Sequence, residues 1–131
     1  MKTATSLISS ATVAAAATDG AGHVQVDLNA LTVNTAVISI TTVTDSTTSP
    51  GIGKQIDIMY AFSPNAITAS TAPAQLAGSV NKVTVTLENG TSLTREYFSA
   101  AAITLNARYM YVWYKQRGMD GPVTLTVQLI S

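Results

Sequence analysis

The feature that most constrains this chain is a period of two in its apolar residues. In the segment "GPVTLTVQLIS", Thr124, Thr126 and Gln128 separate apolar residues. Successive side chains of a β-strand point to opposite faces of the sheet, so this alternation predicts a strand with one buried face. The same pattern recurs in "GHVQVDLNAL", "KQIDIMYAF" and "NKVTVTLENGTSLT". The residues predicted to face the core are Val24, Val26, Leu28, Ile56, Ile58, Tyr60, Phe62, Val83, Val85, Leu87, Val123, Leu125, Val127 and Leu129.

Strand-like segments recur along the chain and predict an all-β fold. Together with β-branched segments at 5–15 and 33–44, they give about eight strands separated by turn signals. We therefore predict that residues 1–131 form a single domain, a two-layer antiparallel β-sandwich of the jelly-roll or immunoglobulin-like type. A closed barrel is the alternative architecture. Residues 1–20 are mostly small, so they are a candidate N-terminal arm that reaches a neighbouring subunit.

Two connections carry more specific expectations. In "LENGTSL", a loop of Glu88, Asn89 and Gly90 would place Val85 opposite Leu93 and keep the apolar face of a hairpin intact. The longest connection, residues 63–78, is expected to be irregular with a helical turn near residues 74–77.

The composition favours a chain that packs against other proteins. Charged residues make up 11% of the sequence, and seven basic residues balance seven acidic ones. A neutral surface has little charge to desolvate when two subunits meet. The charge balance gives no footprint for nucleic acid or an anionic membrane, and no run approaches the ~18 apolar residues of a membrane span. The apolar stretch after Lys2 is interrupted by Ser and Thr, so we expect no secretion signal.

Motifs that carry enzyme chemistry are missing from the sequence. The chain has no Cys, which excludes disulfides and thiolate metal sites, and His23 is its single histidine. Gly53 and Lys54 lack the earlier glycine and the following hydroxyl residue of a phosphate-binding loop. We therefore predict that the chain is not an enzyme and assign no catalytic residue, metal ligand or cofactor.

The segment "ARYMYVWYK", residues 107–115, is apolar on both faces of a predicted strand. We predict that its odd-numbered residues, Tyr109, Tyr111 and Trp113, face the core, and that Trp113 lies opposite Val123 in a closing hairpin. The even-numbered residues would then form an apolar stripe on the outer face. The residues predicted to contact a partner subunit are Arg108, Met110, Val112 and Tyr114.

Three kinds of cover would hide such a stripe from water. The N-terminal arm or the 63–78 connection of the same chain would do so, as would a neighbouring subunit, whose interfaces favour aromatic residues, Met and Arg. A ligand such as a sugar, stacked on aromatic rings, is the third possibility.

The chain as a whole resembles small virion proteins of tailed bacteriophages, and head decoration or cement proteins in particular. The likeness rests on a cysteine-free all-β sequence dense in Thr, Ala and Ser, which closes with "ITLNARYMYVWYKQRGMDGPVTLTVQLIS". The resemblance implies a structural protein that binds the capsid exterior and stabilises the shell. Its partners would be the major capsid protein and its own copies, as a homotrimer or other homo-oligomer, in a virion assembled in the host cytoplasm. Tail-tube, baseplate and fibre-tip sandwiches look similar, so the place in the virion stays open.

A carbohydrate-binding β-sandwich module, from a phage tail or baseplate or a secreted protein, is the alternative function. It predicts an exposed aromatic platform or a concave site near Trp113 and Tyr114.

Overall fold

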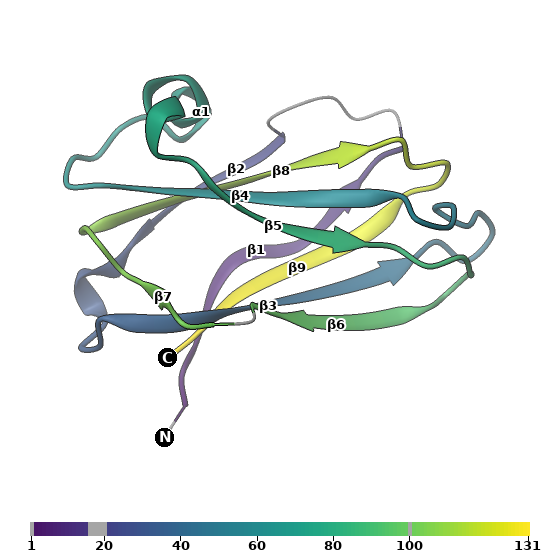
Figure 1. The fold of residues 1–131 in the computed structure, drawn as a ribbon, viewed down its shortest axis with the longest axis horizontal. Coiled ribbons are helices and arrows are strands. Elements are labelled where there is room, and N and C mark those ends of the chain that lie inside the picture. The colour runs from purple at the N-terminus through teal and green to yellow at the C-terminus, as the bar shows by residue number, and fades with distance from the viewer. Residues whose placement is uncertain (1, 16–20, 100) are drawn as a thin grey trace.

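The computed structural model describes residues 2–15, 21–99 and 101–131, and two β-sheets packed face to face dominate it (Figure 1). All strand pairs are antiparallel. The strands are β1 (Ala4–Val13), β2 (Ala21–Asp27), β3 (Thr35–Thr44), β4 (Gln55–Ser63), β5 (Asn81–Thr86), β6 (Thr94–Phe98), β7 (Ile103–Thr104), β8 (Tyr109–Arg117) and β9 (Val123–Ile130). The short helical elements are η1 (Leu28–Ala30), η2 (Ala69–Thr71), α1 (Ala72–Gln75) and η3 (Ala77–Ser79).

The strand order defines the architecture. The first sheet runs β1-β9-β3-β6, with the short strand β7 also paired to β3, and the second runs β2-β8-β4-β5. Of the consecutive strands, β4 and β5 pair with each other, and β6 and β7 both pair with β3. The chain changes sheets between β1 and β2, β2 and β3, β3 and β4, β5 and β6, β7 and β8, and β8 and β9. This is the order of a jelly roll with one added short strand. The predicted two-layer antiparallel sandwich is confirmed, and both sheets are open, unlike those of a barrel.

The core lies between the two sheets and is built by the alternating strands. Val123, Leu125, Val127 and Leu129 of β9 are all buried, and the polar residues between them are only partly covered. The other predicted core residues also pack in this layer, with Val24, Val26, Phe62 and Val83 at its partly exposed margin. Each Val, Leu or Ile side chain that is fully buried contributes roughly 1.5–3 kcal/mol. The prediction of the core faces is confirmed in these four segments.

The N-terminal segment is part of the sandwich over most of its described length. Residues 4–13 form β1, which pairs with β9 at the edge of the first sheet. The predicted arm is therefore wrong for these residues, because Leu7, Ile8 and Val13 are buried in the core. Two register shifts interrupt the pairing, and Ser10, within the second of them, has a φ of 47°. Residues 1 and 16–20 lie outside the described part of the chain.

The connection after β5 does not form the predicted hairpin. Thr86 pairs with Gln55 of β4, whereas Thr94 pairs with Val43 of β3, so the intervening residues pass from one sheet to the other. Gly90 has a φ of 153°, and its N–H donates to Ser49 Oγ at 2.9 Å. The hairpin was predicted because it kept the apolar side chains of both strands on one face. In a sandwich, a strand of either sheet can place its apolar side chains in the shared core, so this criterion does not identify the partner strand.

The same topology overturns the predicted pairing of the last two strands. Trp113 of β8 lies opposite Met59 of β4, and Val123 of β9 lies opposite Thr44 of β3 and Val13 of β1. Strands β8 and β9 therefore belong to different sheets, although a short loop connects them.

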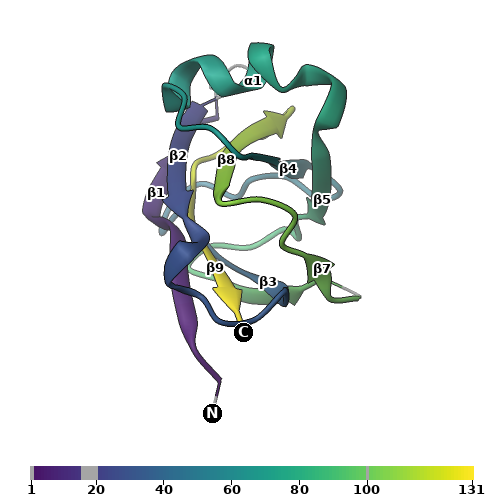
Figure 2. The same cartoon turned by 90° about the vertical axis from the view of Figure 1, so that its left-hand side faces the viewer.

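Residues 64–80 connect β4 to β5 and carry the helical elements η2, α1 and η3 across the outer face of the second sheet (Figure 2). Ala72 of α1 is fully buried, and Pro73 lies in its first turn, where a missing N–H costs nothing. The expected helical turn is present, displaced slightly toward the N-terminus.

Candidate functional site

Strand β8 is buried on both of its faces. Met110, Val112 and Tyr114 point into the main core and are 0%, 1% and 6% exposed. Tyr111 and Trp113 belong to a second apolar cluster with Ala61 and Ala72, on the side covered by the 64–80 connection. The predicted facing of β8 is therefore wrong. Alternation cannot orient a strand whose two faces are both apolar, and here the odd-numbered face is covered by another part of the same chain.

The four residues predicted to contact a partner lie in different environments. Met110, Val112 and Tyr114 offer almost no surface in this fold, whereas the Arg108 side chain is half exposed at the start of β8. Its guanidinium lies 3.1 Å from the Asp27 carboxylate and 5.0 Å from the centre of the Tyr109 ring. Hydrogen bonds from Arg108 and from the Asn29 N–H hold the pKa of Asp27 below its usual value. Arg108 thus joins the end of β2 to the start of β8.

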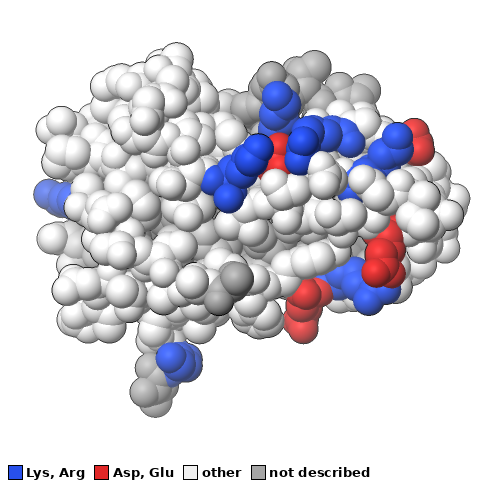
Figure 3. Space-filling view, viewed as in Figure 1, with Lys and Arg blue, Asp and Glu red and all other residues white. Residues whose placement is uncertain are grey.

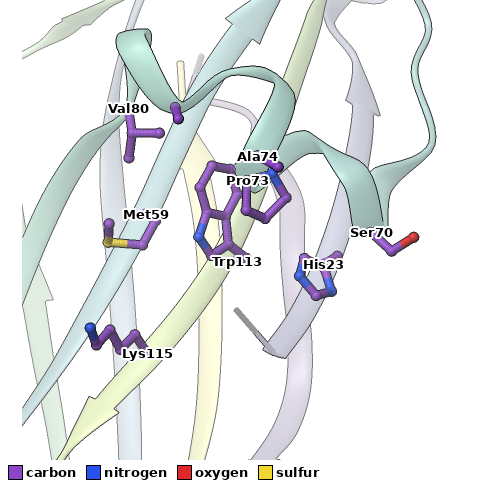
Figure 4. A pocket seen from close by; sticks show the side chains of 9 residues that line it. His23, Met59, Ser70, Pro73, Ala74, Val80, Trp113 and Lys115 are labelled. Carbon is purple, nitrogen blue, oxygen red and sulfur yellow. The ribbon is translucent and has the colours of Figure 1, made fainter. Parts of the chain in front are cut away.

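A pocket of about 610 Å³ lies between the outer face of the second sheet and the 64–80 connection. In Figure 4, Trp113 lies at its centre, with Met59 and Lys115 on one side and His23 and Ser70 on the other. Its apolar walls come from Met59, Pro73, Ala74, Ala77, Val80 and Trp113. The volume falls within the roughly 300–1,000 Å³ range of small-molecule sites.

The concave site expected near Trp113 is present, but it has no aromatic platform there. Trp113 is 4% exposed, and Tyr114 lies in the core on the opposite face of the sheet. Neither ring can stack on a sugar in this arrangement. The indole N–H of Trp113 has no hydrogen-bond partner among the described residues. Its nitrogen nevertheless keeps some exposed surface, since no buried side-chain nitrogen in the described chain lacks a partner. It is therefore accessible from the pocket side of the sheet.

A charge cluster borders the pocket on the part of the sheet that the connection leaves open. The Asp57 carboxylate is 4% exposed and accepts hydrogen bonds from Thr84 Oγ1 at 2.7 Å and from Arg117, whose Nε lies 3.1 Å away. In the strand register, Lys82 of β5 lies opposite Met59 of β4, and Lys115 of β8 lies opposite Asp57 of β4. Figure 3 shows Lys and Arg side chains gathered beside an acidic side chain in the upper part of this view, with further acidic side chains toward the right-hand end.

The outer face of the first sheet has a different character, and we call it the neutral face. The strand registers place the following outward-pointing side chains on it: Ala4, Ser6, Thr12, Val37, Ser39, Thr41, Val43, Thr94, Glu96, Phe98, Thr124, Thr126, Gln128 and Ile130. Glu96 is the single charged residue of this set. Phe98 is 63% exposed, and the helical elements η2, α1 and η3 lie over the other sheet (Figure 2).

Sequence reasoning identified the Thr and Gln residues of β9 as outward-facing but did not assemble the neutral face. That step needs β9 to lie between β1 and β3, which the sequence pattern does not reveal. The pocket was likewise not predicted, although Trp113 and the 63–78 connection were both singled out. The sequence features that pointed to the pocket were the long connection rich in Pro and Ala and the strand at 107–115 that is apolar on both faces.

Within the described ranges, no three His, Asp or Glu side chains gather closely enough to bind a metal ion. No helix in the same part of the chain combines the length and apolarity needed to cross a membrane. The chain is a jelly-roll β-sandwich by its strand order. In comparisons with known proteins, no family model matches the chain, and no curated protein matches it in sequence.

Proposed function

We propose that this chain is a virion structural protein of a tailed bacteriophage, which binds the capsid exterior as a decoration or cement protein and stabilises the shell. The observation that carries the proposal is the neutral face. A sheet surface of Thr, Ser, Val and Gln side chains with one carboxylate loses little charge solvation when another protein covers it. Double-sheet jelly rolls are also a recurrent architecture of viral coat domains.

The details of the neutral face fit a contact surface. Phe98 and Val43 project from β6 and β3 and are among the large apolar side chains most exposed in the described chain. The hydroxyl and amide groups of Thr41, Thr126 and Gln128 point outward from β3 and β9 and can form hydrogen bonds with a partner. Exposed apolar side chains beside neutral polar neighbours suit a protein interface, where charged residues are depleted and aromatic residues enriched.

The mechanism follows from symmetry. A capsid offers many copies of one surface, so a homo-oligomer of this chain would engage several shell subunits together. Linked weak contacts raise the overall affinity by roughly 10²–10⁴ when the geometry permits simultaneous binding. Bridging adjacent subunits in this way stabilises the shell, because a ligand that binds only the assembled state stabilises that state.

Two measurements test the proposal. Light scattering on the purified chain gives its oligomeric state, for which we expect a trimer or another closed homo-oligomer. Co-sedimentation with expanded empty capsids of the parent phage should show saturable binding, and bound capsids should disassemble at a higher temperature. A monomer that does not co-sediment with capsids would refute the proposal, and binding to isolated tails alone would move the protein to another part of the virion.

A further inference from the structure

The pocket beside Trp113 is not used by the proposed capsid contact, because it lies on the opposite sheet from the neutral face. We propose that it is a binding site for a small apolar monocarboxylate, a molecule with a hydrocarbon or aromatic body and one carboxylate group. The proposal rests on the shape and lining of the pocket and on the sign of the charges at its border. It is independent of the virion assignment.

The lining selects an apolar body for the ligand. Met59, Val80, Pro73 and Ala74 present aliphatic surface around the edge of Trp113. A sugar would leave most of its hydroxyl groups without hydrogen-bond partners against such walls, which costs binding free energy for each group. A hydrocarbon or aromatic body gains from the same contact, because its apolar surface leaves water.

The polar groups at the pocket select an acceptor, and specifically an anion. The Trp113 indole N–H is a donor without an acceptor among the described residues. Lys82 lies on β5 next to Met59 of the pocket floor and makes no ion pair with any described residue, while Lys115 lines the pocket directly. His23 and Ser70 are able to donate as well. A carboxylate complements this set of donors, and an ammonium group does not.

Among the described residues, the carboxylate of Asp57 lies at this border, but it does not cancel the preference of the pocket for an anion. Asp57 is buried, and its two oxygens are engaged by Arg117 and Thr84. Its charge is thus already compensated within the sheet. The positive charge that this leaves at the border of the pocket is that of Lys82, which lies beside Met59 in an adjacent strand about 4.8 Å away.

The site is tested by titrating the full-length chain with decanoate and, as a matched uncharged probe, 1-decanol. Trp113 is the single tryptophan of the chain, so its fluorescence reports on the pocket directly. We expect a saturable change in emission and a binding heat with decanoate, and at least a fivefold weaker affinity for decanol. The absence of a saturable signal with decanoate would overturn the proposal, as would saturable binding of simple sugars in its place.

Variants separate this pocket from binding elsewhere on the protein. Ala74→Phe fills the pocket and should abolish the decanoate signal, whereas Gln75→Phe places the same ring outside it and should not. Lys82→Glu should weaken decanoate about fivefold at low salt and leave decanol unchanged. Lys54→Glu, the same charge change away from the pocket, should have no effect. Equal responses within either pair would overturn the assignment.

Discussion

The buried hydroxyl of Tyr111 accepts a hydrogen bond from the backbone N–H of Ile67 at 2.7 Å and donates one to the Asn65 carbonyl at 3.1 Å. Gln25 Nε2 lies 3.1 Å from the same oxygen and donates to it. One side chain of β8 therefore holds β2 and the start of the 64–80 connection against the outer face of the second sheet. The connection, in turn, forms one wall of the pocket.

Replacing this hydroxyl should loosen the connection without disturbing the sandwich. Tyr111→Phe leaves the Ile67 N–H without its partner, and we expect the free energy of unfolding to fall by about 1–3 kcal/mol. Amide hydrogen exchange should accelerate over residues 64–72. Tyr114→Phe is the control, because the Tyr114 hydroxyl has no hydrogen bond within the described chain. Faster exchange in both variants, or in neither, would contradict this role for Tyr111.

The predictability of this fold differs between strands for a physical reason. In β9 each apolar residue faces the core and each polar residue faces out, so the period of two identified the buried face correctly. In β8 both faces are apolar, because one contacts the core and the other contacts Ala72 and its neighbours. The local sequence pattern does not distinguish the face that packs in the core from the face that is covered by the 64–80 connection. For that reason Met110, Val112 and Tyr114 were predicted to lie on an exposed face, whereas they are buried in the core.

The positions of the connections were predictable from the sequence, but the sheet that the chain enters after each connection was not. Turn residues marked the ends of β5 and β8 correctly, yet the next strand in each case joins the other sheet. A hairpin and a crossing loop require the same Gly and Asn residues, and both keep apolar side chains in the core. The pocket and the neutral face depend on which strands become neighbours, so they appeared only with the fold.

The ion pair between Asp57 and Arg117 provides a second prediction. Arg117→Gln leaves the buried Asp57 carboxylate with Thr84 as its remaining side-chain partner. Loss of a buried pair costs several kcal/mol, but the Arg117 side chain is 44% exposed, so we expect about 1–3 kcal/mol from urea denaturation. Arg95→Gln breaks the exposed pair with Glu88 and should cost well under about 1 kcal/mol.

A double variant distinguishes charge burial from simple loss of packing. Adding Asp57→Asn to Arg117→Gln removes the uncompensated charge and should restore much of the lost stability. Additive losses in the double variant would contradict the electrostatic explanation.

The two exposed aspartates with lowered pKa values predict a loss of stability in acid. Hydrogen bonds from Arg108 and the Asn29 N–H lower the pKa of Asp27, and those from Thr47 and neighbouring backbone N–H groups lower that of Asp45. Each carboxylate stabilises the fold fully above its unfolded value of 3.8, and this contribution is lost as the pH falls through its lower folded value.

Thermal unfolding between pH 7 and pH 2 measures this effect. Asp27→Asn should lower the melting temperature at pH 7 and leave it nearly unchanged at pH 2, so the curves converge in acid. Added salt should reduce the difference at pH 7, because the pair with Arg108 is exposed. A gap that stays constant down to pH 2 would exclude ionisation of Asp27 as the cause.

A glycine in the loop before β9 should tolerate no side chain. A Cβ at Gly121 would lie 2.6 Å from the Thr48 carbonyl oxygen and 2.8 Å from that of Ser49. Gly121→Ala therefore forces two backbone segments apart, and we expect it to cost about 1–3 kcal/mol of stability. Gly78→Ala, where no atom lies within 4 Å of the added Cβ, should be neutral or slightly stabilising. Similar urea midpoints for the two variants would contradict the close packing of this loop.

The neutral face is the most direct target for a test of function. Thr126 lies on β9, paired with Thr41 of β3, and its side chain points away from the core. Thr126→Lys should fold normally, because surface substitutions usually change stability by less than about 0.5 kcal/mol. In a capsid contact, however, the ammonium group would have to lose its hydration, a cost that the neutral hydroxyl does not carry. We therefore expect at least a tenfold loss of co-sedimentation with capsids.

The matched control for this prediction is Thr86→Lys, which adds the same charge to an exposed position on the second sheet. If the neutral face binds the shell, Thr86→Lys should retain full binding while Thr126→Lys loses it, with equal urea midpoints for both. Because each oligomer contributes several contacts, the loss should be steeper in binding to capsids than in binding to an isolated capsid subunit. Full binding by Thr126→Lys, or equal loss in both variants, would mean that the shell contacts another surface of the sandwich.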